Sequence, residues 1–285
     1  MKKGLNLWTV IGFAYTGTPT VEEVLRRARE YGYDGVEIVY DDGLLDPARL
    51  DGAWRRRIVE LADSLGLEIP SVATGVFWKY NMGLPEGSKE REMGLRYGEA
   101  GLQLAHDLGA EVLLVVPAVA VPGVPYEEIL GNASAALKRL AGKAEDLGVT
   151  IGVENVWNKL LYSPLEYKGF IEGVGSDAVK AYFDVGNVVA LGLHDHWIPL
   201  LKGLLAMVHV KDFDESVGGL RGFRHVGMGG IDWPHVLELL RGAGYDGFLN
   251  VECPPEFYGE REPRYPEDGF RAARDNAEAL KRLIG

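Results

Sequence analysis

Four residues able to bind a metal ion each close a short apolar run of the sequence. VTIGVE ends in Glu154, AYFD in Asp184, MVH in His209 and FLNVE in Glu252. Runs rich in Val, Ile and Gly are typical of strands buried on both faces, and a carboxylate at such a strand end is costly to desolvate without a partner. Three carboxylates and one imidazole suit a divalent cation. The residue types therefore predict a metal site.

The elements that must position these residues follow a regular alternation. Longer stretches between the apolar runs carry apolar residues three and four apart, and most of them end near a glycine, which predicts helices. The apolar runs cover residues 5–14, 35–40, 69–75, 112–119, 150–156, 180–187, 207–213 and 248–253, and the helical patterns include residues 21–32, 54–66, 89–109, 126–148 and 233–244. Alternating strands and helices imply parallel pairing with right-handed crossovers.

Eight such units predict an α/β fold, a single (β/α)8 TIM barrel that spans residues 1–285 as one domain. An open doubly wound sheet is the alternative, but the first strand-to-helix turn lacks GxGxxG and the sequence has no Walker motif. In a barrel the carboxyl ends of the strands surround one mouth, so the four candidate ligands can converge there. The long connections at 76–88, 214–230 and 254–269 follow strands and should frame that mouth.

Composition limits the classes of partner. The chain has 285 residues and a net charge of -12, which disfavours nucleic acid and anionic membranes. A single cysteine, Cys253, excludes an intramolecular disulfide framework and fits a cytoplasmic protein. Polar residues interrupt the first apolar run, which favours a barrel strand over a signal peptide, and no run approaches the about 20 residues of a membrane span.

The same residues carry a family resemblance. GVENVWN, YFDVGN, VHVKD and VECP resemble the metal site of the sugar isomerases and epimerases with a xylose isomerase-like TIM barrel. YFDVGN and FRHVGMGGIDW are similar to segments of L-ribulose-5-phosphate (L-xylulose-5-phosphate) 3-epimerases and ketose 3-epimerases. The resemblance covers most of the chain and is more specific to the superfamily than to a substrate.

The resemblance implies a metal-dependent isomerase or epimerase of a ketose or ketose phosphate, with C3 epimerisation favoured. One divalent ion, Mn2+ first and Mg2+, Co2+ or Zn2+ as alternatives, would be held by Glu154, Asp184, His209 and Glu252. Inversion of a carbon next to a carbonyl needs a proton removed from one face and returned to the other through an enediolate. Glu154 and Glu252 are the expected acid–base pair. Aldose–ketose isomerisation needs the same groups and stays open.

Two departures from the free-ketose epimerases favour a phosphorylated substrate. Asn187 stands where those enzymes typically carry His, and Leu160 where they tend to have Glu. Arg224 matches a family arginine that contacts substrate oxygens, and its guanidinium would suit an enediolate or a phosphate. Phosphate binding by Arg221 and the neighbouring glycines 218, 219 and 222 is a further expectation for the loop 214–230.

Further substrate-binding candidates are Glu37, Trp8, Lys211 and Asn187. Glu37 closes the second apolar run and is expected in the mouth, either behind the metal ligands or on a sugar hydroxyl. Lys211 follows His209 and should orient it or the substrate. Aromatic residues are expected to form an apolar wall that orients the sugar. They are Trp8, Phe13, Phe77, Trp78 and Trp157.

Other activities of this architecture remain open. Hydroxypyruvate isomerase and inosose dehydratase are relatives with comparable ligands, and a sugar-binding barrel without catalysis is a further alternative. An endonuclease IV-type nuclease ranks lower, because it needs three zinc ions and more histidines than the six present. The expected partner is a small-molecule sugar or sugar phosphate, with no nucleic acid and no membrane. The relatives often assemble, so a homodimer or homotetramer is expected.

Overall fold

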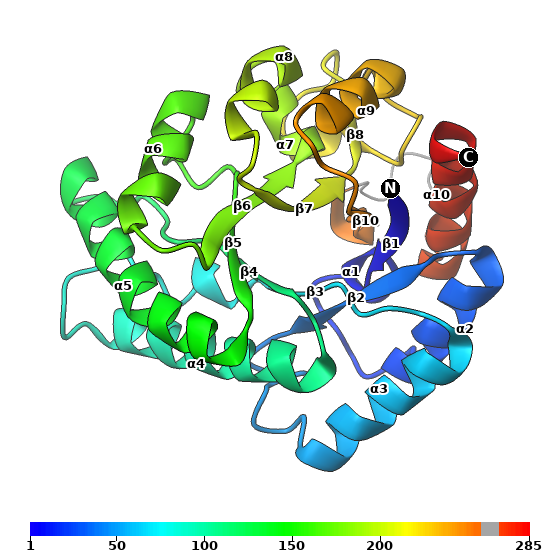
Figure 1. The fold of residues 1–285 in the computed structure, drawn as a ribbon, viewed down its shortest axis with the longest axis horizontal. Helices are drawn as coiled ribbons and strands as arrows, with labels where there is room; N and C mark the ends of the chain where they lie inside the picture. The colour runs from blue at the N-terminus through cyan, green and yellow to red at the C-terminus, as the bar shows by residue number, and fades with distance from the viewer. Residues whose placement is uncertain (258–267) are drawn as a thin grey trace.

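The computed structural model describes residues 1–257 and 268–285, which form a closed barrel of eight parallel strands surrounded by helices (Figure 1). The (β/α)8 prediction is therefore confirmed. Around the barrel the order is β1-β10-β7-β6-β5-β4-β3-β2. The barrel strands are β1 (Lys2–Asn6), β2 (Gly35–Tyr40), β3 (Ser71–Thr74), β4 (Val112–Val115), β5 (Thr150–Glu154), β6 (Val179–Asp184), β7 (Leu205–Val210) and β10 (Phe248–Val251).

The first and last barrel strands close the ring. β1 pairs in parallel with β2 through Leu5 and Val36, and with β10 through Leu5 and Val251. The two short strands β8 (Asp212–Phe213) and β9 (Phe223–Arg224) form an antiparallel pair outside the barrel sheet. This pair belongs to the connection after β7, so it lies at the carboxyl end of the barrel strands, where barrel enzymes place their active sites.

Helices cover the outside of the barrel. The five helical patterns predicted from the sequence are observed as α2, α3, α4, α5 and α9. The longer helices are α2 (Val21–Tyr31), α3 (Gly52–Leu65), α4 (Lys89–Leu108), α5 (Tyr126–Leu147), α6 (Pro164–Val174), α9 (Trp233–Gly242) and α10 (Gly269–Ile284). A capping box of Thr20 and Glu23 begins α2, and Gly32 ends it in the left-handed conformation at φ 85°. No described helix is long and apolar enough to cross a membrane.

Every predicted strand except 35–40 ends earlier than its apolar run, and three of these runs continue into another element. The run 5–14 leaves the sheet after Asn6 and continues as the short helix α1 (Trp8–Ile11). The run 180–187 ends at Asp184, whose side chain accepts a hydrogen bond from the Asn187 amide and so caps α7 (Val185–Val189). The run 207–213 breaks at Lys211 between β7 and β8. In each case the strand stops where its polar residue must face the mouth. Short elements α8 (His194–Trp197), η1 (Val76–Trp78), η2 (Pro199–Leu201), η3 (Leu220–Gly222) and η4 (Pro255–Phe257) complete the described chain.

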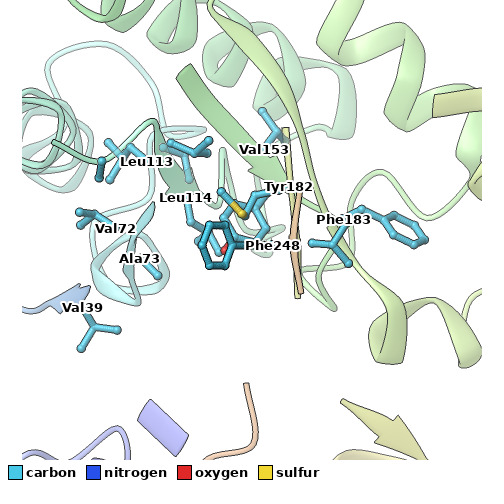
Figure 2. Close-up of a cluster of buried hydrophobic side chains, with 14 of the residues drawn as sticks. Val39, Val72, Ala73, Leu113, Leu114, Val153, Tyr182, Phe183 and Phe248 are labelled. Atoms are coloured by element: carbon cyan, nitrogen blue, oxygen red, sulfur yellow. The ribbon is translucent and has the colours of Figure 1, made fainter. Parts of the chain in front are cut away.

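The core contains side chains from the strands and from the helices that cover them. Figure 2 shows Val72, Leu114 and Val153, from β3, β4 and β5, in a buried cluster with Tyr182 of β6. Phe183 points away from Tyr182, as expected for consecutive residues of one strand. This alternation directs Tyr182 toward the barrel axis, where its hydroxyl contacts polar residues. Most of the predicted loop 254–269 lies outside the described residues.

Candidate active site

The four candidate ligands converge at the carboxyl end of the barrel. Glu154 and Asp184 are the last residues of β5 and β6, His209 lies near the end of β7, and Glu252 follows β10. One ligand atom from each residue lies within 4.8 Å of those of the other three. His209 Nδ1 is 3.4 Å from Glu154 Oε1, 3.6 Å from Glu252 Oε2 and 3.9 Å from Asp184 Oδ2. All four are buried, and we refer to them as the carboxylate–histidine cluster.

Glu37 lies behind this cluster. Its Oε2 is 2.7 Å from His209 Nε2, and Ser71 Oγ donates to its Oε1 at 2.8 Å. Tyr182 and Asn6 donate two further hydrogen bonds to the same carboxylate. Fully buried and held by four side chains, Glu37 fixes the orientation of the imidazole and leaves Nδ1 facing the three cluster carboxylates. Such carboxylate–histidine pairs orient metal-binding histidines.

Lys211 supplies a positive charge on the other side of the cluster. Its ammonium group donates hydrogen bonds to Asp184 Oδ2 and Glu252 Oε2. The same nitrogen lies 5.2 Å from the ring centroid of Phe223 and 5.8 Å from that of Phe257. Lys211 is buried, and the carboxylates of Asp184 and Glu252 raise its pKa despite its desolvation, which acts in the opposite direction. It is therefore a permanent cation beside two candidate ligands.

The charges in the site are unbalanced without a further cation. Within the part of the chain that the structure describes, four buried carboxylates, those of Glu37 and the cluster, contact two cationic side chains, His209 and Lys211. Burial raises the pKa of Glu154 to about 7, helped by the nearby Glu252 and Asp184 and opposed by its hydrogen bond with His209. Burial alone would lower the pKa of His209, but Glu37 and Glu252 outweigh it and hold the pKa well above its usual value.

The residues fit a divalent cation. The cluster offers three carboxylate oxygens and one imidazole nitrogen to a common centre, a donor set suited to Mn2+ and similar ions. A cation there would offset the excess of buried negative charge and would compete with the proton that the carboxylates hold on His209. The hydrogen bond that Glu37 accepts from His209 Nε2 is already in place.

A cavity of about 670 Å3 opens above the cluster. Glu154, Glu252, Lys211, Asn187 and Trp8 line it. The cavity thus brings together both catalytic candidates and three of the substrate-binding candidates. Glu37 and Arg224 do not line it. Asp184 and His209, the other two candidate metal ligands, are fully buried beneath it. The Asn187 side-chain amide donates to Asn155 O at 3.0 Å, which fixes the side chain at the cavity wall.

Arg224 is buried and is not among the residues that line the cavity. Its guanidinium donates to the backbone oxygens of Arg221 and Phe223, at 2.5 and 2.8 Å, and contacts Asp214 Oδ2 at 3.2 Å. Arg221 is exposed and also absent from the cavity lining. Substrate contact by Arg224 and by Glu37, and phosphate binding by Arg221, remain predictions that the observed side-chain positions do not support.

Several site residues escaped the sequence analysis. Asn155 accepts a hydrogen bond from the Asp184 amide at 2.7 Å and donates to Asp184 O at 2.9 Å, which ties β5 to β6 beside the cluster. Its position directly after Glu154 was the available signal. Phe223 and Phe257 line the cavity, whereas Phe77, expected there, is fully buried in the core. Phe223 begins the two-residue strand β9 and Phe257 ends the short helix η4, and such short elements leave no periodic pattern in the sequence.

Comparison with known proteins agrees with the fold. A family model described as the xylose isomerase-like TIM barrel matches residues 25–283. L-ribulose-5-phosphate 3-epimerase from Salmonella typhi is 27% identical over 236 residues, which are 81% of each chain. A solved L-ribulose 3-epimerase superposes with a TM-score of 0.79 at 22% identity, over 99% of this chain and 93% of its own. The IOLI protein, solved with a zinc atom, gives 0.79 at 19% identity over all of both chains. This chain belongs to the xylose isomerase-like TIM barrel family.

Proposed function

We propose that the protein is a divalent-metal-dependent epimerase of a ketose or ketose phosphate that inverts C3, the carbon next to the carbonyl. Aldose–ketose isomerisation is the alternative outcome of the same proton transfers. Support comes from the family, from the curated relative named as an L-ribulose-5-phosphate 3-epimerase and from the solved L-ribulose 3-epimerase. Mn2+ is the proposed ion, with Mg2+, Co2+ or Zn2+ as alternatives, and the IOLI relative holds zinc.

Two glutamates in one cavity carry the proposal. Glu154 and Glu252 both line the cavity, and β6 and β7 separate their strands in the barrel. They can therefore reach a bound sugar from two directions. One glutamate removes the proton of C3 and the other returns a proton to the opposite face, because a single base would restore the starting configuration.

Four further residues, Asp184, His209, Glu37 and Lys211, would hold the metal ion, orient its histidine ligand or bind the substrate during this proton transfer. Asp184 and His209 would hold the metal together with the glutamates, and Glu37 keeps the imidazole oriented. When bound, the ion would polarise the carbonyl and favour the enediolate. Lys211 lines the cavity beside Glu252 and can donate to a substrate oxygen. Glu154 lines the cavity and can accept or return a proton at the bound sugar.

Solvent isotope exchange tests the proposal. Mn2+-loaded protein is incubated in D2O with a panel of ketoses and ketose phosphates, and NMR follows deuterium at C3 and the appearance of the epimer. We expect both, and we expect Glu154→Gln and Glu252→Gln each to lower the rate by about 100-fold or more. Hydroxypyruvate and inosose in the same panel test the alternatives. Absence of exchange with every compound contradicts the proposal.

Assembly and location extend the proposal. We propose a homodimer or homotetramer, as the family resemblance implies, in the cytoplasm, which the single cysteine Cys253 fits. Light scattering of the purified protein measures the assembly, and a monomeric mass contradicts it.

A further inference from the structure

The wall of the cavity is largely aromatic. Trp8, Phe13, Phe257, Phe223 and Trp157 form a continuous series of rings, which we call the aromatic arc, with successive centroids 5.2, 5.6, 4.7 and 4.9 Å apart. All five line the cavity. They come from the segments after β1, β10, β7 and β5, so the arc surrounds a large part of the mouth. Such a surface packs against the C–H faces of sugar rings rather than against an ionic group.

Trp78 adds an aromatic face away from the arc. It ends the short helix η1 after β3, lines the cavity and is 46% exposed. An exposed tryptophan on a cavity wall offers a flat apolar face on which a sugar ring can pack. Asp41 and Asp42 line the cavity near the same strand ends. Their carboxylates can accept hydrogen bonds from sugar hydroxyls.

The charge of the lining is unfavourable for a phosphate. Among the described lining residues the cations are Lys79 and Lys211, and no arginine is present. Lys79 is paired with Asp42, and Lys211 with Asp184 and Glu252. The loop expected to bind phosphate presents Leu220 and Phe223 to the cavity. Among the lining residues that the structure describes, a phosphate would therefore meet paired cations and apolar side chains, whereas phosphate sites use free Arg, Lys or backbone N–H groups.

The size of the cavity exceeds that of a monosaccharide. At about 670 Å3 it lies within the range that encloses a drug-sized ligand. A ketohexose, C6H12O6, is smaller than such a ligand. Trp78, Asp41 and Asp42 line the same cavity as Glu154 and Glu252 and follow β3 and β2, so the cavity extends from the carboxylate–histidine cluster to these strand ends.

We infer that the substrate is an uncharged keto sugar extended by a second sugar ring, and not a sugar phosphate. The reacting ketose lies over the carboxylate–histidine cluster, and the second ring packs on Trp78 with its hydroxyls donating to Asp41 and Asp42. The inference rests on the proposed function, since it names the substrate class of that reaction. The chemistry is unchanged: the C3–H bond breaks, the proton passes to one glutamate, and a proton returns to C3 from the other.

A matched substrate series tests the inference. Each ketohexose stereoisomer is offered to the Mn2+-loaded protein in three forms that differ at the terminal hydroxyl: free, phosphorylated and glucosylated. Deuterium incorporation at C3 gives kcat/KM for each form. We expect the glucosylated form to exceed the other two by about tenfold or more. A phosphorylated form that is preferred, or a free form equal to the glucosylated one, overturns the inference and leaves the proposed function intact. Exchange with none of the three overturns both.

Two variants locate the second ring. Trp78→Ala should lower kcat/KM for the glucosylated form by about tenfold and for the free form by less than about twofold. Leu165→Ala is the control, because Leu165 is 70% exposed and lies outside the cavity lining. Leu220→Arg, at a 61% exposed position of the lining, should raise the use of the phosphorylated form by supplying a free cation. Equal effects of Trp78→Ala on both forms contradict the placement of the second ring.

Discussion

Replacing Glu154 with Gln should stabilise the metal-free protein while weakening its metal site. Glu154 is buried beside Glu252 and Asp184, and burial, the largest cause, raises its pKa to about 7 from 4.5. Gln has nearly the same shape but no charge to desolvate. The wild-type protein must bury this carboxylate in ionised form above neutral pH, and the variant avoids that cost.

The magnitude and its pH dependence follow from the shift. Between pH 4.5 and about 7 the folded protein holds the Glu154 proton and the unfolded chain does not. The contribution of Glu154 to the free energy of unfolding is therefore at its maximum below pH 4.5 and is lost as pH rises through 7. The loss is about 3 kcal/mol, at about 1.4 kcal/mol per pKa unit. Glu154→Gln should therefore equal the wild type near pH 4 and exceed it by about 3 kcal/mol at pH 8, roughly 5–10 °C in Tm.

Denaturant unfolding of the wild type and of Glu154→Gln, with EDTA at pH 4, 6 and 8, measures the difference in their free energies of unfolding. Excess Mn2+ should reverse the order at pH 8, because ligand at about 1,000 times Kd adds about 4 kcal/mol to the wild type and less to the variant. Glu37→Gln is the matched control. Despite its burial, His209 lowers the pKa of Glu37, so this substitution should destabilise the protein at pH 8. A Glu154→Gln advantage that is absent at pH 8, or unchanged at pH 4, refutes the reasoning.

Three further predictions follow from the same structure. Metal binding should release protons and weaken as pH falls, because the carboxylates hold a proton on His209. Calorimetry in two buffers of different ionisation enthalpy measures the proton release, and a binding heat that does not depend on the buffer contradicts the prediction. Lys211→Met should destabilise the EDTA-treated protein by about 3–5 kcal/mol, since the buried carboxylates of Asp184 and Glu252 lose their partner. Urea unfolding measures the change, and a decrease in unfolding free energy below about 1 kcal/mol contradicts the prediction. Gly269→Ala should lower the free energy of unfolding by about 1–3 kcal/mol, because a Cβ there would lie 2.3 Å from Val10 O. Gly131→Ala in α5 has open space at its Cβ and should raise the free energy of unfolding by up to about 1 kcal/mol. Thermal melts compare the two variants.

Much of the fold was predictable because its signals are local. Buried strands produce continuous apolar runs, helices produce a three-to-four spacing, and glycines such as Gly32 and Gly66 mark helix ends in the left-handed conformation. Strand ends were less accurate. The run 180–187 gave no sign that Asp184 would turn back and cap α7, because that hydrogen bond depends on the loop geometry.

The sequence by itself determined the barrel, the four cluster residues and the family, because strand ends at one mouth make convergence a consequence of topology. Only the tertiary structure decided how the other polar groups are used. It placed Glu37 behind His209, directed Arg224 toward Asp214, and assembled Phe223 and Phe257 into the cavity wall. These contacts join residues far apart in the chain, and the direction of a side chain in a loop is set by packing against partners that no sequence spacing reveals.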